Sequence, residues 1–280
     1  MSKKVLLEKA KNSFEQGTNL QNQGKVEESI ASYQKAIQIK PDYVQPLLKL
    51  ATIYESQEDW EQAVNCYQRM IGLTPQLPKA HLGLARALKQ QNNIYGAISA
   101  YQKAIELKPD WGANVYKEFA DTLLIQQDPL ETAIYAYQKA AQLKSDWPVS
   151  FYVRYANTLQ QKGYLTDAIG YYQKAIEFKS DAPAIYISLG NIQLQQGQLN
   201  EAMNSYQKAI ELDEKSVPGY KGLGNVLNQK GQLDDASKCY WKVISLKPEA
   251  LGIYRLLGDI LMRQGRTSEA NDCYRKAMAI

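Results

Sequence analysis

Hydrophobic residues recur along this chain with the period of an α-helix, and the whole pattern returns about every 34 residues. Tyr186 and Leu189 are three positions apart, and Ala202 and Tyr206 are four apart, so each pair falls on one face of a helix. Polar residues occupy most positions between them. The chain is therefore predicted to consist of amphipathic helices that each bury one face.

Glycine and proline mark the ends of these helices. In the sixth repeat unit, one helix is expected at residues 183–196 and a second at 199–212, with Gly197 in the turn between them. A left-handed turn residue favours glycine, and the candidates are Gly24, Gly163, Gly197, Gly231 and Gly265. Prolines are expected to follow second helices at Pro41, Pro75, Pro109 and Pro248, and to open first helices at Pro78, Pro183 and Pro218.

A short motif sets the repeat length. The string YQKAI begins at Tyr33, Tyr101, Tyr172 and Tyr206, and variants of it begin at Tyr67, Tyr137, Tyr240 and Tyr274. A small residue precedes each tyrosine by four positions: Ser29, Ala63, Ala97, Ala133, Ala168, Ala202, Ala236 and Ala270. Self-similarity of this kind predicts a single solenoid over residues 1–280, with eight repeats at 10–43, 44–77, 78–112, 113–148, 149–182, 183–216, 217–250 and 251–280.

Small residues also recur on the first helices, where they allow close approach to the second helices: Gly17, Ala51, Ala85, Ala120, Ala156, Gly190, Gly224 and Gly258. The recurrent tyrosine is expected to fill the space between repeats. This 34-residue pattern closely resembles the tetratricopeptide repeat (TPR). The resemblance implies an all-α, right-handed α-solenoid superhelix, similar to that of O-linked GlcNAc transferase, whose concave surface is lined by first helices and binds peptides or protein segments.

The fourth repeat departs from the pattern. It has an extra residue near Gly112 and a longer turn at Gln127, Asp128 and Pro129. Surface turns accept added residues at small entropic cost, so this is either a tolerated insertion or a hinge.

Composition narrows the range of partners and locations. Of 280 residues, 45% are hydrophobic and 22% charged, as in ordinary folded proteins, and the formal net charge of +4 is small for binding nucleic acid. No stretch has the length and apolar character of a membrane span or a signal peptide. The three cysteines do not form a disulfide framework, which favours a reducing compartment and a cytoplasmic location.

Chemistry-bearing residues are scarce, which argues against an enzyme. His81 is the only histidine and occupies a position held by tyrosine in sister repeats, so it is expected to pack rather than catalyse. Cys66, Cys239 and Cys273 each precede the recurrent tyrosine and are expected to fill small spaces without pairing. No dinucleotide or phosphate-binding loop is complete. We therefore expect no catalytic residue, no metal and no cofactor.

The informative positions lie on the first helices, opposite the packing face. Phe14, Thr18, Leu48 and Thr52 begin this stripe, and the candidate groove residues are Lys49, Lys79, Arg86, Lys89, Lys117, Asp121, Arg154, Asn157, Asn191, Lys221, Asn225, Arg255 and Asp259. Asn157, Asn191 and Asn225 are equivalent in three consecutive repeats. Such a ladder of amides can bind the backbone of an extended peptide, or it can cap local polar groups. On the first alternative, replacing all three with alanine should weaken binding with little change in stability.

Two site types known within the family are matched only in part. A clamp for a C-terminal carboxylate would use Lys221 and Asn225, but the next repeat has Leu256 where the clamp needs asparagine. The asparagine ladder of the GlcNAc transferase falls three residues before ours, at Arg154, Ser188 and Gly222. The resemblance therefore supports the fold without reproducing either site.

The partner is expected to be a protein or peptide. Lys49, Lys79, Arg86 and Lys89, with Glu55 as the main counter-charge, suggest that the N-terminal half prefers acidic segments. Tyr274, Ala277, Met278 and Ile280 would expose an apolar helix flank, which suggests either self-association through the last repeat or a longer protein. Function is accordingly either that of a free-standing scaffold or that of the N-terminal substrate-recruiting or assembly module of a larger enzyme, such as a glycosyl-, sulfo- or methyltransferase. The full reading frame distinguishes them.

Overall fold

The computed structural model describes residues 3–126, 130–178 and 181–278, and in these segments the chain is helical with no strand. It forms two compact units, residues 1–145 (unit 1) and 146–280 (unit 2), which are described separately. In unit 1 the helices are α1 Lys3–Asn22, α2 Val26–Ile39, α3 Val44–Ser56, α4 Trp60–Leu73, α5 Pro78–Gln90, α6 Ile94–Leu107, α7 Ala113–Leu123, the 3-10 helix η1 Leu124–Gln126 and α8 Leu130–Leu143. In unit 2 they are α9 Val149–Lys162, α10 Leu165–Glu177, α11 Pro183–Gln195, α12 Leu199–Leu212, α13 Val217–Gln229, α14 Leu233–Leu246, α15 Leu251–Arg263 and α16 Thr267–Met278.

The helices agree with the predicted pairs. In the sixth repeat, the observed bounds of α11 and α12 differ from the predicted ones by a single residue. All five candidate turn glycines have left-handed φ angles, between 75° and 89°. Glu58 and Asn92 take the same turn position in the second and third repeats, with φ of 58° and 59°. These two residues adopt a conformation that favours glycine, so the turn geometry is set by the repeat rather than by glycine alone.

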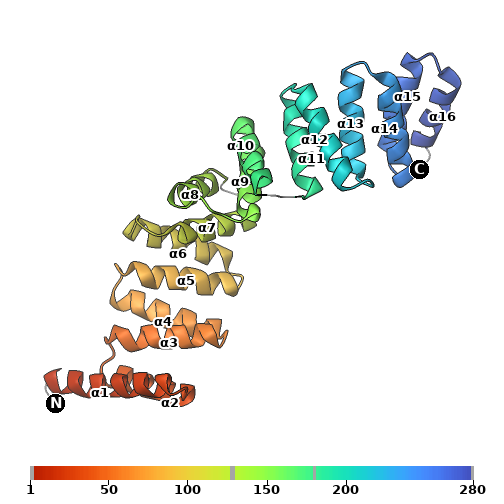
Figure 1. The fold of residues 1–280 in the computed structure, drawn as a ribbon. Coiled ribbons are helices and arrows are strands. Elements are labelled where there is room, and N and C mark those ends of the chain that lie inside the picture. The colour runs from red at the N-terminus through yellow and green to blue at the C-terminus, as the bar shows by residue number, and fades with distance from the viewer. Residues whose placement is uncertain (1–2, 127–129, 179–180, 279–280) are drawn as a thin grey trace. The chain divides into compact units, whose positions relative to one another are not determined.

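Helices pack in chain order, the two members of each pair against each other and most second helices against the next first helix. Figure 1 shows this stacking for α3, α4, α5 and α6 in unit 1 and for α11 to α14 in unit 2. One buried core joins α2 to α6 in unit 1, and another joins α13 to α16 in unit 2. The small cores between consecutive pairs are thus joined into a continuous layer within each of these segments.

The recurrent tyrosines occupy the centre of this layer. Tyr33, Tyr101, Tyr137, Tyr172, Tyr206 and Tyr240 are all essentially inaccessible to solvent. A Cβ added at Gly190 would lie 3.0 Å from Cε1 of Tyr206, and one added at Gly222 of the next repeat would lie 2.2 Å from the same atom. One ring therefore fills the space between two successive first helices, as the small-residue pattern predicts.

Two irregular regions can be compared with the sequence. Residues 108–112 separate α6 from α7, one residue more than the four that separate α4 from α5, which accounts for the insertion near Gly112. The turn at Gln127, Asp128 and Pro129 lies outside the described residues, as does Ile280. In the last helix, Tyr274 and Ala277 pack partly against the core of unit 2 and Met278 is exposed.

Candidate functional site

Eight equivalent positions on the first helices form what we call the first-helix row. Each lies 15 residues before the recurrent tyrosine of its own repeat, or 16 in the fourth repeat. The row consists of Thr18, Thr52, Arg86 and Asp121 in unit 1, and of Asn157, Asn191, Asn225 and Asp259 in unit 2. All eight side chains are exposed or partly exposed. The row is thus a set of accessible polar groups that recurs once per repeat.

In unit 2 each tyrosine hydroxyl reaches its row residue. The hydroxyls of Tyr206 and Tyr240 donate to Oδ1 of Asn191 and Asn225, both at 2.7 Å. The Tyr172 hydroxyl donates to Oδ1 of Asn157 in the same way. Burial raises the pKa of both Tyr206 and Tyr240 to about 12, so these hydroxyls remain protonated donors at neutral pH. The asparagines therefore do satisfy local polar groups, which was one of the two expectations for them.

Acidic residues at the same position establish the direction of this hydrogen bond. Asp259 accepts from the Tyr274 hydroxyl at 2.9 Å, and Asp121 accepts from the Tyr137 hydroxyl at 2.5 Å. An ionised carboxylate can only accept, so the tyrosine must donate in these repeats. The same orientation in the asparagine repeats leaves the amide nitrogen as the outward-facing group. Local capping and an outward binding group are consequently compatible in one side chain.

This contact corrects the expectation that alanine at the three asparagines would leave stability nearly unchanged. Removing the amide leaves a buried phenol without that acceptor, at a cost of about 1–3 kcal/mol for an unsatisfied group. Tyr172 loses less, because Gln160 Oε1 lies 3.0 Å from its hydroxyl. Alanine is therefore a poor probe of binding here.

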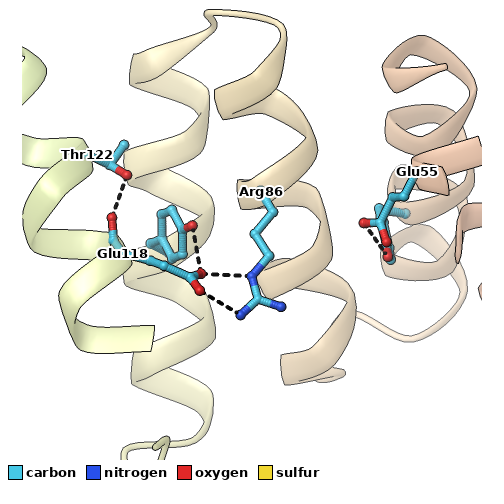
Figure 2. A network of polar contacts seen from close by, with 6 residues as sticks. Glu55, Arg86, Glu118 and Thr122 are labelled. Carbon is cyan, nitrogen blue, oxygen red and sulfur yellow. Dashed lines mark hydrogen bonds and ion pairs between the residues drawn. The ribbon is translucent and has the colours of Figure 1, made fainter. Parts of the chain in front are cut away.

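In unit 1 two members of the row, Arg86 and Asp121, are charged, and both are paired. Arg86 forms a two-pronged ion pair with Glu118 of the next repeat, at 2.8 Å from Nε to Oε2 and 3.1 Å from the terminal nitrogen to Oε1. Figure 2 shows the Arg86 guanidinium extended toward Glu118, with Glu55 on the side away from that pair. Glu118 also accepts from Tyr101 at 3.3 Å. Beside this network lies a pocket of about 330 Å³ whose lining includes Lys89 and Trp60.

This ion pair corrects the expectation that Glu55 is the main counter-charge of Arg86. Its counter-charge is Glu118, 32 residues away on α7, while Glu55 accepts a hydrogen bond from Tyr67 at 2.9 Å. Lys117 is likewise paired, with Asp121 at 2.6 Å. A pairing between successive repeats depends on how the helices stack, which a single repeat does not reveal.

The remaining candidates lie where the sequence placed them, on first helices. Lys49 is on α3, Lys79 and Lys89 on α5, Arg154 on α9, Lys221 on α13 and Arg255 on α15, and all are exposed or partly exposed. Phe14 is the exception, because its ring packs against Tyr33 and Tyr43, each at 5.6 Å between centroids, rather than lining a groove. Gly222 is explained by packing, since the Tyr206 ring fills the place where its side chain would begin.

Residues considered for chemistry have structural roles. His81 is buried, and its Nε2 lies 2.9 Å from the carbonyl oxygen of Pro75. Cys66, Cys239 and Cys273 are free and buried, and burial raises the pKa of the Cys66 and Cys239 thiols to about 11. Among the residues that the structure describes, no three His, Cys, Asp or Glu side chains gather as a metal site would require. In the same residues, no helix combines the length and apolar character needed to cross a bilayer.

Comparison with known families identifies the repeat. A family profile described as TPR repeat matches residues 20–57, 156–197, 190–227 and 224–265. Profiles described as tetratricopeptide repeat match residues 48–110 and 251–280. Together they cover most of the chain, which therefore belongs to the tetratricopeptide-repeat family. No curated protein matches the sequence.

Solved structures support the same assignment. MamA is 26% identical with a TM-score of 0.54, over 57% of this chain and 92% of MamA. YrrB, described as a TPR protein with an unusual peptide-binding site, is 18% identical with a TM-score of 0.57, over 68% of this chain and 97% of YrrB. A structure of Naa15/Naa10 bound to HypK is 14% identical with a TM-score of 0.66, over 90% of this chain and 39% of that one. The last two show likeness of fold alone.

Proposed function

We propose that this chain is a protein-interaction scaffold that binds an extended segment of another protein along the first-helix row of a unit. The observation that carries the proposal is the row itself: polar groups recur once per repeat and remain accessible, and in unit 2 each accepts a hydrogen bond from the recurrent tyrosine of its repeat. A regular array of this kind suits a ligand that is itself regular along its length. Membership of the TPR family and the peptide-binding site named for YrrB are consistent with this role.

The preference of the N-terminal half for acidic segments stays a prediction. Pairing of Arg86 with Glu118 and of Lys117 with Asp121 reduces the free positive charge that such a preference needs. Lys49, Lys79 and Lys89 are the residues that would carry it. Self-association through the last repeat also stays a prediction.

Bulky groups on first helices should block binding, and the buried native thiols make this testable. Cysteine placed at Lys79 or Lys221, both exposed on first helices, can be labelled with a large maleimide while Cys66, Cys239 and Cys273 stay protected. Matched adducts at Gln102 and Gln207, exposed on α6 and α12, serve as controls. For a peptide selected from a random twelve-residue library, we expect at least one first-helix adduct to lower affinity tenfold or more, with both control adducts near wild type. Calorimetry that finds no loss at either first-helix site would reject the proposal.

A further inference from the structure

The row in unit 2 is uncharged over three repeats and presents donors in a fixed direction. Oδ1 of Asn191 and of Asn225 accepts from a tyrosine hydroxyl at 2.7 Å, so the amide nitrogen is the group that this bond leaves over on an exposed (Asn191) or partly exposed (Asn225) side chain. Asn157 repeats the arrangement with Tyr172 on the preceding pair of helices. Of the neighbouring groove positions, Ser188 and Gly222 add no charge, whereas Arg154 and Lys221 are exposed basic residues. The row itself therefore offers uncharged hydrogen-bond donors, with positive charge beside it.

The donors recur at the spacing of packed helices. The Tyr206 ring lies against both Gly190 and Gly222, the residues that precede Asn191 and Asn225 by one and three positions. Helices in such direct contact have axes about 8–10 Å apart. Asn191 and Asn225 occupy equivalent positions on α11 and α13, so their amides should recur at about that interval.

One backbone conformation has this period. A polyproline II helix has three residues per turn and rises about 3.1 Å per residue, so every third carbonyl points the same way at intervals of about 9 Å. In a β-strand, carbonyls on the same side recur every second residue, at about 7 Å. Proline also lacks an N–H, so a proline-rich backbone offers acceptors and no donors. The period and the polarity of the row both fit that ligand.

We propose that the first-helix row of unit 2 binds a proline-rich segment in the polyproline II conformation through its backbone carbonyls. The proposal rests on the proposed function and specifies the class of partner. Recognition uses the amide nitrogens of Asn157, Asn191 and Asn225, each held by its tyrosine. Because neither the amides nor the backbone carbonyls are charged, binding should change little with salt.

Aspartate is the diagnostic substitution, because it keeps the acceptor for tyrosine and removes the donor for the ligand. Aspartate already occupies the equivalent row position at Asp259, where it accepts a hydrogen bond from the Tyr274 hydroxyl. The probe is a blocked oligoproline nonamer, measured by calorimetry against wild type and Asn191→Asp/Asn225→Asp. Loss of two hydrogen bonds should weaken binding about 25-fold while the thermal midpoint stays close to wild type. Asn204→Asp/Gln207→Glu, with the same charge change on exposed positions of α12, should bind like wild type.

Two results would overturn the inference. One is failure of the nonamer to bind wild type at millimolar concentration, and the other is equal binding by wild type and the double aspartate variant. If peptides from the random library still depend on first-helix positions in either case, the scaffold function stands and only the ligand class is wrong. Loss of that dependence instead rejects the proposed function.

Discussion

Replacing Tyr206 with alanine is expected to lower the free energy of unfolding by about 3–5 kcal/mol, the range for removing a large buried ring. Tyr206 is 1% exposed, and its ring contacts Gly190 of its own repeat and Gly222 of the next. Glycines have no side chains to fill the resulting cavity, so relaxation would require the helices themselves to move. Urea denaturation followed by circular dichroism measures the effect.

Tyr206→Phe is the matched control, since it keeps the ring and removes only the hydroxyl that donates to Asn191. It should cost about 1 kcal/mol, the usual net value of one hydrogen bond. An alanine variant as stable as the phenylalanine variant would show that the ring does not hold the two repeats together.

Adding one methyl group at Gly222 should destabilise the chain by about 3 kcal/mol, the upper end of the range for overpacking. The new Cβ would lie 2.2 Å from Tyr206 Cε1, and that ring is enclosed on its other side by α11. Better helix propensity of alanine would offset only about 1 kcal/mol of the clash.

Gly170→Ala is the matched control, because this glycine is also inside a helix and its Cβ would meet nothing within 4 Å. There alanine should raise stability by about 0.5–1 kcal/mol. Thermal denaturation of the two variants should therefore give shifts of opposite sign. A Gly222→Ala variant more stable than wild type would contradict the packing described for Tyr206.

The fold could be predicted from the sequence because packing in a solenoid is local. Gly197 and Tyr206 recur at a fixed spacing, and the helices between them follow from that spacing. Glu58 and Asn92 adopt the left-handed turn conformation although neither is a glycine, because the repeat requires that conformation at this position. Positions on the first-helix row were likewise identified correctly as accessible.

What the sequence could not supply was the partner of each row residue. The Tyr206 hydroxyl and Asn191 are 15 residues apart, and Arg86 and Glu118 are 32 apart, so each contact depends on side-chain directions set by packing. As a result the asparagines were expected to be dispensable for stability, and Glu55 was expected to be the main counter-charge near Arg86. The structure changes both expectations, because in each case the partner side chain comes from a neighbouring helix.

Photo-cross-linking would identify the helices that contact a bound peptide, and so tests whether the ligand lies along the first-helix row. A library-selected peptide carrying one benzoylphenylalanine would be irradiated in complex with the wild-type chain, and the attachment sites located by mass spectrometry. We expect attachment to first helices, such as α5 in unit 1 or α11 and α13 in unit 2. Attachment mainly to second helices, such as α6, α12 and α14, would contradict binding along the first-helix row.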